Sequence, residues 1–249
     1  MRSCIFCDEV VNSKEDAWPL WLVKHLGNDT TGIIEGQRGK LKLNNWRAGK
    51  YPLRIGCVCQ KCNNGWMSGL ENRAKPIIES FFIENKVALN HSDQTTLATW
   101  ICKSAMVYEA LRFESHCFFT YEERKFFRES FQLPIYTSIW IAKSVNWTGL
   151  YCSAHDLSGN MPETNDQVKS YVTTMGLGPL AIQIFSGKLD KSSYENLTLI
   201  GDFQLGPWEK ITLQIWPVVL DEVIWPNEIG LNGEFGLDCF SQRWKISQR

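Results

Sequence analysis

At residues 59–66 the chain reads Cys59-Gln60-Lys61-Cys62-Asn63-Asn64-Gly65-Trp66, and near its start it reads Cys4-Ile5-Phe6-Cys7. A two-residue spacer lets both sulfurs of a Cys-x-x-Cys pair face one ion, and two pairs complete a tetrahedral shell. A closed shell leaves no position for water, so the pattern predicts a structural zinc ion held by Cys4, Cys7, Cys59 and Cys62. Four separate buried thiols are the alternative. Cys57 is a further candidate ligand, but its spacing to Cys62 is poorer.

The composition bounds the class of protein. The chain has 249 residues, of which 44% are hydrophobic and 21% charged, and its net charge is −1. These values are typical of a globular protein with one large domain or two small ones. No apolar run approaches ~18 residues, which predicts that nothing spans a membrane. Nine cysteines and no cleavable leader before Cys4 favour a reducing, cytoplasmic setting.

A basic stretch lies between Gln37 and Leu70, where the chain has no acidic residue. Trp46 and Tyr51 are interleaved with its lysines and arginines. Positive charge attracts phosphate and aromatic rings stack on bases, so the stretch predicts nucleic acid as a partner. The residues that we expect to contact it are Arg38, Lys40, Lys42, Arg47 and Lys50. A solvated basic loop is an equally simple interpretation.

The remaining pattern predicts helices first and strands afterwards. Apolar spacing and capping residues indicate helices near residues 18–25, from 63 until Pro76 ends or kinks the helix, near 92–111 and near 120–129. Runs of β-branched and aromatic residues predict strands at 135–141, 149–154, 168–174, 180–185, 197–200 and 211–216. We therefore predict an α+β fold with a zinc-binding unit at residues 1–83. A second domain at residues 84–249 has helices followed by a mostly antiparallel sheet.

The order Cys4-x2-Cys7, Glu15-Asp16, Cys59-x2-Cys62-Asn63 resembles that of the zinc-bearing HNH, or His-Me finger, endonucleases, in particular the phage endonuclease VII type. In that family the cysteine pairs hold zinc and brace a ββα unit. An acidic residue followed by histidine lies between the pairs, and Asn or His follows the last cysteine. Over about residues 1–75, the resemblance implies that Glu15 and Asn63 bind a catalytic Mg²⁺ or Mn²⁺. It also implies that Asp16 stands where the family has its catalytic histidine.

The aspartate at position 16 changes the expected chemistry. An imidazole with a pKa near 6.5 can accept a proton from water close to pH 7, whereas an aspartate with a pKa of about 4 is a weaker base. It also adds negative charge beside an anionic phosphate. His25 is the nearest substitute, but a helix would put it over ~13 Å from Asp16, so a packing role is the better interpretation.

Three functions follow from these features. In the first, the chain is a metal-dependent nuclease that hydrolyses phosphodiesters with Glu15, Asp16 and Asn63 around Mg²⁺ or Mn²⁺. Alternatively it is a non-catalytic, zinc-stabilised module that binds nucleic acid through the basic stretch. In the third interpretation the zinc unit only stabilises the fold, and the C-terminal sheet binds another protein.

Overall fold

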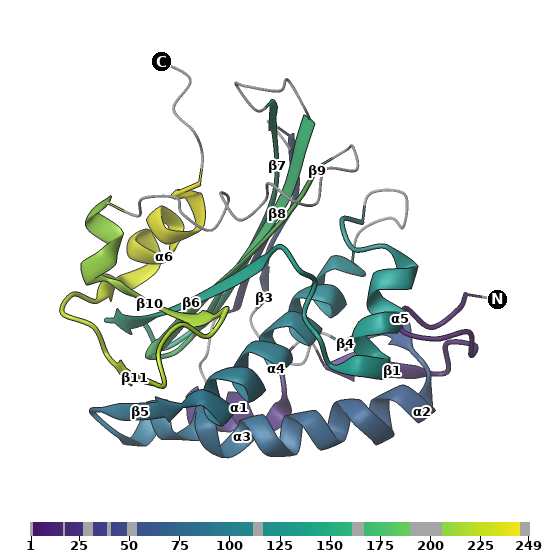
Figure 1. Cartoon of the computed structure of the whole chain (residues 1–249), viewed down its shortest axis with the longest axis horizontal. Helices are drawn as coiled ribbons and strands as arrows, with labels where there is room; N and C mark the ends of the chain where they lie inside the picture. The colour runs from purple at the N-terminus through teal and green to yellow at the C-terminus, as the bar shows by residue number, and fades with distance from the viewer. Residues whose placement is uncertain are drawn as a thin grey trace.

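The computed structural model describes residues 2–16, 18–26, 32–38, 41–48, 54–111, 117–160, 167–189 and 206–244, with the backbone alone for 32–38, 41–48, 158–160, 167–168, 189 and 206–207. It is an α+β protein in which helices pack on a curled β-sheet (Figure 1), as the sequence predicts. The helices are α1 (Leu20–Leu26), α2 (Gln60–Cys62), η1 (Asn63–Met67), α3 (Ser68–Ile83), α4 (His91–Glu109), α5 (Tyr121–Ser130), η4 (Gly206–Lys210) and α6 (Gly233–Gln242). No helix within the described ranges is both long and apolar enough to cross a bilayer.

The large sheet contains strands from both ends of the chain. Its order is β10-β6-β9-β8-β7-β2-β3, and β12 lies beside β6. Its strands are β2 (Gly32–Arg38), β3 (Leu41–Ala48), β6 (Thr137–Val145), β7 (Leu150–Asn160), β8 (Gln167–Leu177), β9 (Leu180–Leu189), β10 (Thr212–Trp216) and β12 (Leu231–Asn232). Neighbouring strands are antiparallel except for the β2–β7 and β12–β6 pairs, which are parallel. The predicted strand at 197–200 lies outside the described residues.

Two smaller sheets complete the fold. Strand β1 (Ser13–Asp16) pairs with β4 (Arg54–Val58), and β5 (Val87–Asn90) pairs with β11 (Glu222–Trp225), both antiparallel. The parallel β2–β7 pair was not predicted, and it joins a hairpin from the first 83 residues to the C-terminal sheet. The division into two domains at residue 83 remains a prediction.

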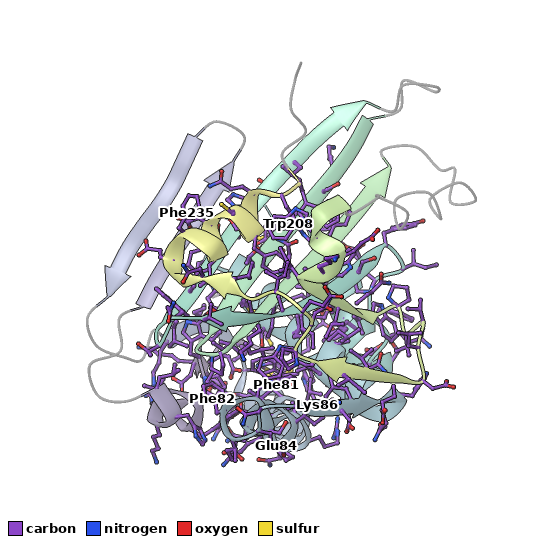
Figure 2. All side chains as sticks on the ribbon, turned by 90° about the vertical axis from the view of Figure 1, so that its left-hand side faces the viewer. Phe81, Phe82, Glu84, Lys86, Trp208 and Phe235 are labelled. Atoms are coloured by element: carbon purple, nitrogen blue, oxygen red, sulfur yellow. The ribbon has the colours of Figure 1, made fainter. Side chains whose placement is uncertain are left out.

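Different hydrophobic clusters pack on the two faces of the large sheet. Successive residues of a strand point to opposite faces. In β6, Ile139 and Ile141 belong to the main core with α3 and α4, while Trp140 and Ala142 pack on the side of α6. In Figure 2, Phe81 lies in the main core and Trp208 lies beside α6. Helix α4 is therefore enclosed between the sheet and α3.

Helix boundaries follow local chemistry with one exception. Thr120 and Glu123 form the predicted capping box of α5. A capping box formed by Asn90 and Asp93 also starts α4. The helix therefore begins at His91, slightly earlier than the predicted start near residue 92. Of the two predicted effects of Pro76, ending the helix is wrong, because α3 continues to Ile83, and kinking it stays a prediction. The buried side chains of α3 continue on both sides of the proline, and their packing offsets the lost backbone hydrogen bond.

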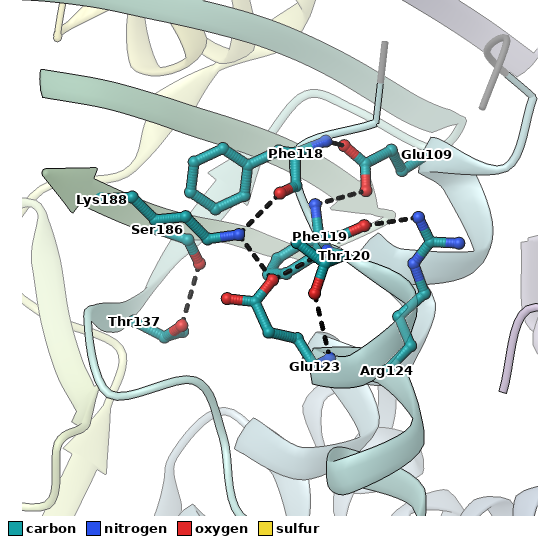
Figure 3. Close-up of polar contacts among 9 residues, drawn as sticks. All are labelled: Glu109, Phe118, Phe119, Thr120, Glu123, Arg124, Thr137, Ser186 and Lys188. Carbon is teal, nitrogen blue, oxygen red and sulfur yellow. Dashed lines mark hydrogen bonds and ion pairs between the residues drawn. The ribbon is translucent and has the colours of Figure 1, made fainter. Parts of the chain in front are cut away.

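A polar network fixes α5 onto α4 and the sheet (Figure 3). The fully buried Glu109 carboxylate, at the end of α4, accepts the N–H groups of Phe118 and Phe119. Lys188 of β9 donates to the Phe118 carbonyl at 2.7 Å and to the Glu123 carboxylate. Helices α4 and α5 and strand β9 are thereby held together by charged groups, of which Glu109 is fully buried and Lys188 and Glu123 are partly buried.

Candidate metal centre

The four predicted cysteines form one cluster. Their sulfur atoms all lie within 4.8 Å of one another, and all four residues are buried. The Cys7 sulfur is 3.6 Å from those of Cys59 and Cys62. Tetrahedral zinc with Zn–S bonds of ~2.3 Å separates its sulfurs by about 3.8 Å, so these distances fit such an ion. The cluster could therefore hold a metal ion such as zinc, as predicted.

Local hydrogen bonds shape both cysteine pairs. The first pair lies in a turn in which the Cys4 N–H donates to the Glu9 carbonyl at 2.8 Å and the Cys7 N–H donates to the Cys4 carbonyl. In the second pair the Cys62 N–H points at the Cys59 sulfur, 3.4 Å away. Burial raises the pKa of the Cys59 thiol, but this and other hydrogen bonds to its sulfur outweigh burial and lower its pKa. Burial raises the pKa of the Cys7 and Cys62 thiols in the same cluster, so the thiolate that zinc requires is favoured at Cys59 and not at those two.

Cys57 lies outside the cluster. Its side chain is fully buried in β4, and burial, together with the nearby Glu15 carboxylate, raises the pKa of its thiol to about 12. Its sulfur is not among the four that lie close together in the cluster. Cys57 is therefore a core residue, and its carbonyl anchors the first cysteine pair by accepting the Ile5 N–H at 3.0 Å.

The residues that the nuclease resemblance selects lie on neighbouring elements. Glu15 and Asp16 are in β1, where Asp16 pairs with Arg54 of β4 in the strand register. Asn63 begins η1, directly after the second cysteine pair, and its Nδ2 donates to the Ser13 hydroxyl at 2.8 Å and to the Lys14 carbonyl at 3.1 Å. Asn63 is thus attached to the strand that carries both carboxylates.

Both carboxylates are paired with cations of the chain. The Lys103 Nζ of α4 lies 2.9 Å from the Glu15 Oε1, and these two residues are only 2% and 7% exposed. The Arg54 Nε lies 2.9 Å from the Asp16 Oδ1 in a more exposed pair. Sequence reasoning missed Lys103. The sequence feature that could have pointed to it is the place of this lysine next to the buried stripe of the helix, which contains Trp100 and Ile101.

Glu71 of α3 is a third carboxylate near this position. Its Oε1 accepts the Trp21 indole N–H at 2.8 Å. Burial raises the pKa of Glu71, the Lys103 ammonium opposes that shift, and the Glu15 and Asp16 carboxylates add to it.

No family model, curated protein or solved structure matches this chain. The functional interpretation therefore depends on the geometry and chemistry of the chain itself.

The other predicted site residues are placed as follows. His25 of α1 lies 3.0 Å from the Glu79 carboxylate and stacks on Phe82, so it packs against α3 as expected. Arg38 is the last residue of β2, and Lys42 and Arg47 are in β3, the final strand of the large sheet's main path. Lys40 and Lys50 lie outside the described residues.

Proposed function

We propose that this chain is a zinc-stabilised nucleic-acid-binding protein built on an HNH-like ββα unit that does not hydrolyse its ligand. Support for the ββα unit comes from the antiparallel β1–β4 pair, which is followed in the chain by α2, η1 and α3. A zinc ion on the four cysteines would brace the first turn against the start of α2, because each contributes two ligands. Zinc has a structural role in this proposal.

The observation that carries the proposal is the pairing of both candidate catalytic carboxylates. A catalytic Mg²⁺ or Mn²⁺ needs carboxylate oxygens as ligands. The Glu15 oxygen is held by Lys103 inside the protein, and the Asp16 oxygen is held by Arg54. A divalent cation at Glu15 would have to lie beside a buried ammonium of the same sign. With both carboxylates paired in this way, the function that remains for the unit is to bind nucleic acid without hydrolysing it.

Positive charge between the cysteine pairs supports nucleic acid as the ligand. The stretch from Gln37 to Leu70 has no acidic residue, and part of it forms β2 and β3. Exposed Lys61 lines an open pocket of about 470 Å³ beside Cys59, together with the amide side chains of Asn12, Gln60 and Asn64 and one carboxylate, that of Glu9. Ammonium and amide groups are donors that suit phosphate oxygens.

Salt dependence tests this proposal. Affinity for labelled single-stranded DNA and RNA should fall steeply as salt rises from about 50 to 200 mM. The Arg38→Ala/Lys40→Ala/Lys42→Ala variant should bind more weakly, with a slope of log K against log salt that is shallower by about 2 to 3. Fluorescence anisotropy at several salt concentrations measures both quantities.

A charge-matched variant is the control. Lys86, Lys169 and Lys210 are exposed lysines from other parts of the chain, and replacing all three by alanine should leave the slope unchanged. Equal binding by the parent and the Arg38/Lys40/Lys42 variant at low salt would show that the basic stretch is a solvated loop that does not contact nucleic acid. The proposal of a nucleic-acid ligand would then fail.

The nuclease is the second candidate, and the position of Asn63 favours it. Through Ser13 and Lys14, Asn63 is held against the strand that contains Glu15 and Asp16. The three residues that the resemblance selects are thereby held on adjoining elements, which a catalytic unit also requires.

An activity assay decides between the two candidates. We expect the parent to leave plasmid, single-stranded DNA and RNA intact with Mg²⁺ or Mn²⁺, because Asp16 is a weak base and Glu15 is already paired. If the chain is a nuclease instead, its activity will need the cation and disappear in Glu15→Ala. Asp16→His should then raise the rate by up to about 10²- to 10⁴-fold, the usual contribution of a general base.

A further inference from the structure

We propose that Trp66, Arg73 and Phe131 form a stacking platform on which Phe131 takes one base of a single-stranded nucleic acid. The inference rests on the proposed function and deepens it, because it names a contact to a base, whereas the basic stretch supplies contacts to phosphate. The three residues come from different parts of the chain. Trp66 lies in η1, Arg73 lies in α3, and Phe131 directly follows α5.

The first support is the backbone conformation of Phe131. This residue caps the C-terminus of α5 with φ 56° and ψ 16°, in the left-handed region. Many helices end in this way, but the residue there is usually glycine or asparagine, and a bulky residue is an outlier. Among the described residues the other non-glycine with positive φ is Asn146, a residue type that tolerates it. Backbone strain of this kind clusters at functional sites.

The second support is the position of the Phe131 ring. The residue is 37% exposed, although an aromatic ring contributes most to stability when it is buried. Its ring centroid lies 5.8 Å from that of Trp66, which in turn packs edge-on against Phe6, between the first two cysteines. The Phe131 N–H donates to the Phe127 carbonyl at 2.8 Å. The ring is therefore fixed at the surface against the segment that carries the cysteine pairs.

The third support is a cation beside the ring. The Arg73 Cζ lies 5.8 Å from the Phe131 ring centroid, within cation–π reach, and Arg73 is exposed. Every base has a π-face that stacks on an aromatic ring, and a guanidinium pairs with phosphate. One nucleotide therefore satisfies both groups of the platform. An apolar protein surface would cover the ring but leave the guanidinium without a counter-charge.

The experiment removes the ring and the backbone strain together. Phe131→Gly should have an unchanged or higher Tm, because glycine adopts the left-handed region without strain. Its affinity for labelled oligothymidine at about 100 mM salt should fall about 5- to 100-fold, the usual loss for one stacking ring. The slope of log K against log salt should stay the same, because no charge is removed. Fluorescence anisotropy and thermal unfolding measure these quantities.

An abasic strand of the same length is the matched ligand control. It keeps the phosphates and lacks the bases, so the parent and Phe131→Gly should bind it equally. Phe131→Tyr keeps a ring and should keep the affinity for oligothymidine. Phe126→Ala removes another exposed ring of α5 and should have no effect. Arg73→Gln should weaken binding and make the salt slope shallower by about 0.7, the value for one contact to a single strand.

Two results would overturn the inference. One is a Phe131→Gly variant that binds oligothymidine as tightly as the parent does. The other is an equal loss of affinity for the abasic strand, which would show that the ring acts through the fold. If the glycine variant does not fold, Phe131→Asn takes its place, because asparagine also adopts the left-handed region.

Failure of this inference is distinguishable from failure of the proposed function. A parent that binds oligothymidine with a steep salt dependence, but does not need the Phe131 ring, refutes the stacking platform alone. A parent that binds neither DNA nor RNA refutes the proposed function and the platform with it.

Discussion

Cys62→Ser should release zinc and unfold the first part of the chain. Structural zinc sites contribute apparent binding energies of about 10 to 16 kcal/mol near pH 7, and this energy is part of the folding energy. Cys62 is fully buried within the cluster, where a serine hydroxyl is a much poorer ligand than a thiolate. Elemental analysis should find about one zinc per parent chain and much less in the variant. Thermal unfolding should begin at a lower temperature.

Hydrogen exchange locates the effect. Amide protection should be lost first around the two cysteine pairs and in β1 and β4. Cys239→Ser is the matched control, because Cys239 is exposed on α6, and it should change neither zinc content nor protection. A parent that contains no zinc, together with a Cys62→Ser variant of unchanged stability, would refute the predicted metal centre.

The second large effect concerns the buried ion pair. Glu15→Leu should destabilise the zinc-loaded protein by about 3 to 5 kcal/mol, because it leaves the Lys103 ammonium buried without its charged hydrogen-bond partner. Adding Lys103→Met removes that charge as well. The double variant should recover most of the loss, or exceed the parent by about 1 to 4 kcal/mol. Denaturant titrations of the four proteins complete the double-mutant cycle.

An exposed ion pair is the comparison for this cycle. Lys210 and Glu228 are 3.4 Å apart and each side chain is 67% exposed, so Glu228→Ala should have little effect. If Glu15→Leu is equally mild, the Glu15–Lys103 pair is not desolvated, and both this prediction and the burial argument for Lys103 fail.

Features with local chemical rules could be predicted from the sequence. The two-residue spacing places the Cys4, Cys7, Cys59 and Cys62 sulfurs on one centre, and the Thr120–Glu123 capping box starts α5. Alternating β-branched and aromatic residues locate the starts of β6 to β10 within two residues, whereas β7 runs six residues past its predicted end.

Features that depend on distant packing could not be predicted in this way. Nothing in residues 32–38 indicates that β2 pairs in parallel with β7, because the pairing joins segments more than a hundred residues apart. Similarly, Lys103 is buried only because α3, β1 and the sheet surround α4. A helix sequence alone places a lysine at the surface. The buried Glu15–Lys103 pair therefore becomes visible only in the folded chain.

The parallel pairing of β2 with β7 limits how the cysteine segment can be transplanted. A fragment that ends at Ile83 would contain every zinc ligand, but β2 would lose its neighbour on one side. In the remaining piece, β7 would present an open edge along the seven positions that β2 now covers. Unpaired edges of this kind recruit other strands and promote aggregation. Grafts of the segment onto other proteins, and natural recombination at this point, would therefore have to supply a replacement strand.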